Sequence, residues 1–110
     1  MVTEYQQYIP TPITPKVVNL DTQVAEYAID DINSQNYPDT YASWGKSKID
    51  WINSMQRPAA KYVLENYNCD HVEMVALSPS KSIKPNTVVF NVDCTNGKRF
   101  YASNLDLKEN

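Results

Sequence analysis

The alternation of apolar and polar residues near the carboxyl end of the chain constrains the fold most strongly. Apolar residues at every second position predict half-buried strands over 72–76 and 88–93. The tripeptide Thr95-Asn96-Gly97 after the second strand predicts a tight hairpin, because glycine adopts the positive φ that closes such a turn. The last third of the chain is therefore predicted to form a three-stranded antiparallel β-meander.

The length of the hairpin loop fixes the register of the last two strands. With three loop residues, Phe100 lies opposite Val92 and Ala102 lies opposite Phe90. This register gathers the apolar side chains of the meander on one face. The predicted apolar face consists of Val72, Met74, Ala76, Val88, Phe90, Val92, Phe100 and Ala102.

Apolar residues recur at helical spacing through the first two-thirds of the chain. The pattern predicts helices at about 21–33, from about 43 to Pro58, and at 58–67, with a loop over 34–42. Proline fits a first helical turn better than a helix interior, so two helices that meet at Pro58 are favoured over one kinked helix. We expect a two-layer α+β fold, in which three helices pack on one face of the three-stranded antiparallel β-meander.

The length of the chain, 110 residues, suits one hydrophobic core. Residues 1–16 carry three of the seven prolines, which excludes a helix there and predicts an extended arm. This arm is interpreted either as a proline-rich docking ligand or as an extended segment on the domain surface. Residues 17–110 are expected to form a single α+β domain.

The net charge of the chain and the distribution of its apolar residues limit the classes of partner and the cellular compartments that we expect. The net charge is -3 and the isoelectric point is near 5.0, which gives no general attraction to nucleic acid or anionic lipid. Neither a signal peptide nor an apolar stretch long enough to span a bilayer is visible. The predicted address is cytoplasmic, unless a targeting segment has been removed, and neither nucleic acid nor a membrane is an expected partner.

Cys69 and Cys94 flank the first two predicted strands. The register puts Cys94 on the apolar face, and a bridge would need Cys69 to lie just before the first strand. A cytoplasmic address favours free thiols, so the pairing of the two residues stays open at this point. Two cysteines and one histidine cannot complete a four-ligand zinc site without carboxylates, and we expect neither a metal nor a cofactor.

The chain offers few residues for catalysis. His71 is its sole histidine, and a thiol-dependent enzyme would pair it with Cys69 as the nucleophile. We favour the interpretation that His71 is a surface residue at a strand edge. The two glycines, Gly45 and Gly97, lie too far apart for a glycine-rich phosphate loop. We therefore expect no enzymatic activity.

The stretch between Lys16 and Lys46 is acidic and contains no basic residue. Tyrosines in the predicted loop after the first helix add the residue type in which protein interfaces are enriched. This combination favours a protein partner with a basic surface; a solvated helix face is the alternative interpretation. The predicted partner-binding residues are Glu26, Asp30, Asp31, Tyr37, Asp39 and Tyr41.

Residues 69–103 carry three short motifs, at 69–73, 88–94 and 96–101. These motifs resemble a small bacterial and phage module of unassigned activity, and the resemblance implies a bacterial or mobile-element setting. Our hypothesis is a non-enzymatic protein-interaction module, in the form of a phage or mobile-element inhibitor that occupies the surface of a host macromolecular complex. The alternative is a structural or secreted accessory domain stapled by a disulfide between the two cysteines.

Overall fold

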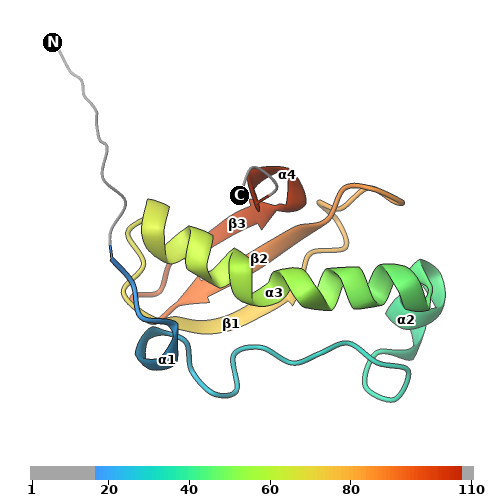
Figure 1. Ribbon diagram of the computed structural model, residues 1–110, viewed down its shortest axis with the longest axis horizontal. Helices are drawn as coiled ribbons and strands as arrows, with labels where there is room; N and C mark the ends of the chain where they lie inside the picture. The colour runs from blue at the N-terminus through green and yellow to red at the C-terminus, as the bar shows by residue number, and fades with distance from the viewer. Residues whose placement is uncertain (1–16, 108–110) are drawn as a thin grey trace, which may run out of the picture.

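The computed structural model describes residues 17–107, which fold into the α+β architecture predicted from the sequence. One layer of this described part is a three-stranded antiparallel sheet of β1 (Val72–Leu77), β2 (Val89–Cys94) and β3 (Arg99–Ser103), in the order β1-β2-β3. The long helix α3 (Lys46–Asn66) runs across one face of the sheet (Figure 1). The predicted arm at 1–16 lies outside the described residues.

Short helices lie at the ends and edges of these two layers (Figure 1). We predicted a loop over 34–42 and a helix from near Ser43, but Pro38 already begins a helix, because its fixed φ suits the first helical turn. Gly45 then separates this helix from α3 with a φ of 84°, which a residue with a side chain rarely adopts. The short helices of the described part are α1 (Leu20–Gln23), α2 (Pro38–Trp44) and α4 (Asn104–Leu107).

Helix α3 is continuous and contains Pro58. The predicted break at Pro58 is wrong, and the alternative of one helix is correct. Pro58 lies on the exposed side of α3, so the loss of its backbone donor does not interrupt packing on the sheet. Trp44 and Trp51 are half-buried against the core. The buried stripe of α3 consists of Ile49, Ile52, Gln56, Ala59, Ala60, Val63 and Leu64.

The hairpin between β2 and β3 has the predicted register. Val92 pairs with Phe100, and Phe90 pairs with Ala102. Gly97 has a φ of 87°, the positive value expected for the turn. The length of the loop therefore predicted the register of β2 and β3 correctly.

A β-bulge in β1 changes which of its residues face the core. Val72 pairs with Cys94, whereas Met74 pairs with Asp93, so β1 carries one extra residue at this point. The alternation shifts by one position, and Val75 is buried while Met74 is 48% exposed. The predictions of Met74 and Ala76 as core residues are wrong for this reason.

The helix predicted over 21–33 ends at Gln23. From Val24 the chain leaves the helix and runs, without regular helix, to the start of α2. Figure 1 shows this segment as the blue to green chain that connects α1 with α2. We call residues 24–37 the strap.

Backbone hydrogen bonds place the strap along the edge of β1. The Ala25 N–H donates to the Val72 carbonyl (3.0 Å), and the Val75 N–H donates to the Ala28 carbonyl (2.9 Å). The backbone groups at a strand edge need partners, and an extended chain supplies them whereas a helix uses its own groups internally. The strap therefore covers the edge of β1 that the β2 strand leaves free.

Candidate functional site

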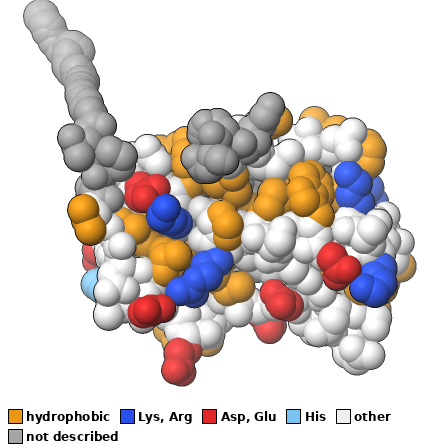
Figure 2. All heavy atoms as spheres, in the orientation of Figure 1, with side chains coloured by type: hydrophobic (Ala, Val, Ile, Leu, Met, Phe, Trp, Pro, Cys, Tyr) orange, Lys and Arg blue, Asp and Glu red, His pale blue; other side chains and the backbone are white. Residues whose placement is uncertain are grey.

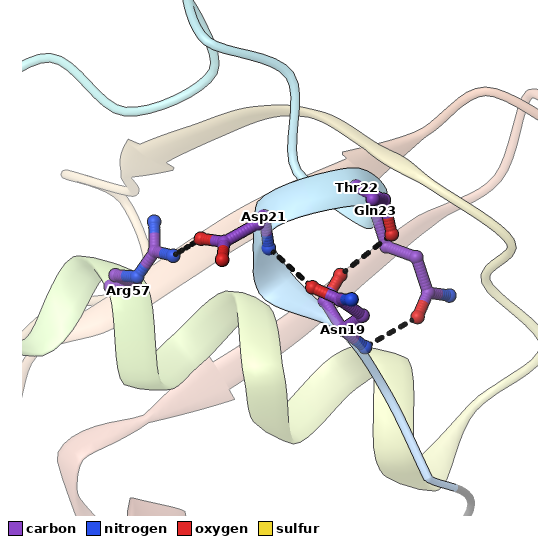
Figure 3. Close-up of polar contacts among 5 residues, drawn as sticks. All are labelled: Asn19, Asp21, Thr22, Gln23 and Arg57. Atoms are coloured by element: carbon purple, nitrogen blue, oxygen red, sulfur yellow. Dashed lines mark hydrogen bonds and ion pairs between the residues drawn. The ribbon is translucent and has the colours of Figure 1, made fainter.

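A cluster of polar contacts fixes the chain just before the strap (Figure 3). The Asn19 side chain caps α1 by accepting a hydrogen bond from the Asp21 N–H (2.9 Å), and Gln23 Oε1 accepts one from the Asn19 N–H (2.8 Å). Arg57 on α3 forms an ion pair with Asp21 (3.2 Å). The first carboxylate of the acidic stretch is thus compensated and links α1 to α3.

Two side-chain amides on α3 hold the middle of the strap. The Ile32 N–H donates to Asn53 Oδ1 (2.9 Å), and Asn53 Nδ2 donates to the Ile32 carbonyl (3.0 Å), as a paired strand would. Gln56 Nε2 donates to the Asp30 carbonyl (3.2 Å) and to Asn53 Oδ1 (3.0 Å). Gln56 is only 2% exposed, so its hydrogen bonds lie in the interior. These bonds fix the strap on α3.

The extended strap separates neighbouring acidic residues. In an extended chain successive side chains point to opposite sides. Asp30 lines a pocket of about 220 Å³ together with Ile32. Asp31 lines a different pocket, of about 460 Å³, together with Ile29 and Glu26. The predicted acidic residues of the strap therefore lie on two sides of it, and Asp39 lies on α2.

Four of the predicted partner-binding residues are carboxylates: Glu26, Asp30, Asp31 and Asp39. Within residues 17–107, none of the four side chains forms an ion pair or a hydrogen bond. Figure 2 shows acidic side chains along the lower edge of the molecule, where Figure 1 places the strap. Ion pairs compensate several carboxylates elsewhere in the described part: Asp21 with Arg57, Asp50 with Lys46, Glu65 with Lys61 and Asp93 with Arg99. The four carboxylates on the strap and α2 therefore lack ion-pair partners in the described part, while Arg57 lines the pocket of Glu26 and Asp31, and Lys84 binds Ser43 of α2.

Tyrosine rings accompany these carboxylates. Tyr37, a predicted contact residue, is 47% exposed at the end of the strap. Tyr41, the other predicted contact tyrosine, is half-buried and packs against the core from α2. Tyr27, which was not among the predicted contact residues and falls within the helix predicted over 21–33, is 77% exposed. The exposed rings give the strap apolar surface beside its charges.

The Asp30 pocket continues into a second hollow beside α2. This hollow has a volume of about 350 Å³ and includes Asp39 and Trp44. Thr40, Leu77 and Pro79 line both hollows. The two hollows are therefore neighbours beside α2 and the chain that leaves β1.

Cys69 and Cys94 form a disulfide, with a Cα–Cα distance of 5.6 Å. Cys69 lies just before β1 and Cys94 ends β2, the arrangement that the sequence required for a bridge. Both residues are buried. Neither sulfur is free to act as the thiolate nucleophile of a thiol-dependent enzyme.

The residues around His71 form a local polar cluster. Asp70 accepts hydrogen bonds from the Thr95 hydroxyl (2.8 Å) and from the His71 N–H (2.7 Å). Both bonds lower the pKa of the Asp70 carboxyl, and the bond from Thr95 makes the larger contribution. His71 itself is exposed, and its backbone carbonyl accepts a hydrogen bond from Thr95 N–H (2.9 Å). These contacts join the start of β1 to the hairpin.

Within residues 17–107, no three His, Cys, Asp or Glu side chains lie close enough together to hold a metal ion. No helix in this described range is long and apolar enough to cross a membrane. In comparisons with known proteins, no family model, no curated protein and no solved structure matches the chain.

Proposed function

We propose that this chain is a non-enzymatic protein-interaction module that binds a basic segment of a protein partner along the strap. The observation that carries the proposal is the set of four uncompensated carboxylates on the strap and α2. The exposed rings of Tyr27 and Tyr37 lie on the same segment and supply apolar contact area. Complementary charge speeds the encounter with a basic partner and selects against acidic ones.

A phage or mobile-element inhibitor of a host complex is the concrete form of this proposal. The motifs over 69–103 support this setting by resemblance alone. An inhibitor of this kind needs a surface that occupies its target, and it needs no reaction chemistry of its own. The strap fits that requirement, because its charges are held by a fixed backbone rather than by a loose tail.

Charge reversal on the strap tests the proposal. The variant Glu26→Lys/Asp31→Lys reverses two uncompensated carboxylates, and its matched control Asp50→Lys/Glu65→Lys reverses two exposed or partly exposed carboxylates on α3. Wild type and both variants are immobilised and used to capture proteins from the cells that make the chain. A partner recovered by wild type and control is then purified, and its affinity is measured by calorimetry.

The expected result is a loss of about tenfold or more in affinity for the strap variant, because each reversal replaces an attraction by a repulsion. The wild-type affinity should also fall as salt rises, since exposed charges are screened. Equal affinity of the strap variant and the control for the partner contradicts the proposal. Circular dichroism of both variants checks that the fold is unchanged.

A disulfide-stapled structural or secreted accessory domain is the second candidate function, and the Cys69–Cys94 bond favours it. Disulfides persist in oxidising compartments and are rare in the cytosol. The bond thus favours an oxidising compartment over the cytoplasm, the location expected from the sequence. Thiol titration of the chain, alkylated at once on release from its native cells, separates the two: two reactive thiols would remove the staple, and none would support it.

A further inference from the structure

The pocket that Asp30 lines lies between the strap and the end of β1. Its volume is about 220 Å³. Its apolar walls come from the strap, from β1 and from the chain that follows β1: Ile32, Val75, Leu77 and Pro79. A concave pocket with apolar walls buries more of a single side chain with an aliphatic stem than a flat surface would.

The pocket is lined by the hydroxyls of Tyr37 and Thr40 and by two acceptor groups that lack donors, on Asp30 and Gln56. Gln56 lines it and is 2% exposed. Its Nε2 donates to the Asp30 carbonyl and to Asn53 Oδ1, so the orientation of the amide is fixed by two acceptors. Within residues 17–107, Gln56 Oε1 accepts no hydrogen bond, and the Asp30 carboxylate has no partner.

A buried acceptor without a donor costs stability, so a ligand that supplies donors gains from entering. We infer that the pocket holds the side chain of a lysine or arginine from the protein partner. This inference rests on the proposed function for the source of the side chain and deepens it by naming the residue type that is recognised. The aliphatic stem would lie on the apolar walls, and the cationic head would donate to Asp30 and Gln56.

Other ligand classes fit the same groups less well. Both ammonium and guanidinium heads carry donors and no acceptor, which matches the two acceptors in the pocket that lack donors, Gln56 Oε1 and the Asp30 carboxylate. An anion would be repelled by the Asp30 carboxylate. A neutral apolar side chain would fill the walls but leave Gln56 Oε1 buried without a donor. The uncompensated charge of the strap further favours a cation.

The test uses the whole chain and small analogues of the two side chains. Amide shifts are followed by NMR during titration with n-butylammonium chloride and with n-propylguanidinium chloride, against sodium chloride at equal ionic strength. We expect saturable shifts at Ile32, Val75 and Leu77 with at least one of the two cations. The neutral analogue 1-pentanol should bind at least tenfold more weakly, because it leaves the carboxylate without a cation.

Matched variants locate the cation. Asp30→Asn should weaken the affinity for the cation about tenfold. Asp31→Asn removes the same charge from the adjacent residue, which lines the other pocket, and should change the affinity by less than twofold. Both residues are exposed, so neither variant threatens the fold.

The outcomes separate this inference from the proposed function. Shifts no larger than those in sodium chloride, equal binding of 1-pentanol, or equal losses for Asp30→Asn and Asp31→Asn would each overturn the cation pocket and leave the strap proposal standing. Cation binding in the pocket, together with unchanged partner affinity in Glu26→Lys/Asp31→Lys, would support the pocket and refute the Glu26 and Asp31 side of the strap as the partner surface.

Discussion

Reduction of the Cys69–Cys94 disulfide is predicted to destabilise the fold without altering its structure. The bond closes a loop between residues 25 positions apart, and restricting an unfolded chain over that separation is worth about 3.5 kcal/mol at 25 °C. Domains of this size are stable by roughly 5–15 kcal/mol, so the loss is a large fraction of the total. Both cysteines are buried, and free thiols pack as small apolar groups, so the reduced chain should retain the native core.

The assay compares the same chain with and without reductant. Urea unfolding should show the reduced form less stable by about 3.5 kcal/mol, and its thermal midpoint should fall by about 15 °C, given the unfolding entropy of 110 residues. The stability of the variant Cys69→Ala/Cys94→Ala should be the same with and without reductant, because this variant has no disulfide to reduce. A difference below about 1 kcal/mol between the oxidised and reduced forms would refute the reasoning that the cross-link acts through the unfolded chain.

Two further predictions concern polar contacts in separate parts of the fold, one around Asp70 and one between Asn53 and the strap. The Thr95 hydroxyl and the His71 N–H lower the pKa of Asp70, so their stabilisation is present above the ordinary aspartate pKa of about 3.9 and is lost as the pH falls through the lower folded value. Asp70→Asn should therefore be less stable than wild type near neutral pH, and the urea midpoints of the two proteins should converge once the pH has fallen below the folded pKa of Asp70. Asn53→Ala removes both side-chain bonds to the Ile32 backbone and should cost roughly 1–3 kcal/mol. Hydrogen exchange should then accelerate at the Ile32 amide, and equal exchange in variant and wild type would contradict the role given to Asn53.

The sheet shows which parts of this fold local patterns can predict. The register of β2 and β3 follows from the length of the turn at Gly97, which is a local property. The bulge in β1 does not follow, because Met74, Val75 and Ala76 are all apolar and both alternations give an apolar face. Pairing with β2 chooses between them, and that contact is not visible in the strand itself.

The strap shows how a local pattern can identify the right residues in the wrong conformation. Val24, Ala28 and Ile32 recur at helical spacing and are buried, as a helix would require. The edge of β1 and the amide of Asn53 instead bind the backbone of this segment in an extended form. Tertiary contacts therefore overrode the helical propensity.

The candidate site depends on this change of conformation. The acidic residues could be named from the sequence because charge does not depend on fold, but a helix would have used the Asp30 carbonyl in its own hydrogen bonds. In the extended strap that carbonyl accepts from Gln56, a polar residue at a core position of α3. A glutamine on an otherwise apolar stripe is a sequence signal for the pocket that our sequence predictions did not use, since a buried amide must find partners beyond its own helix. The strap satisfies the Nε2 side of this amide, so the Oε1 side is the part of Gln56 left for a ligand.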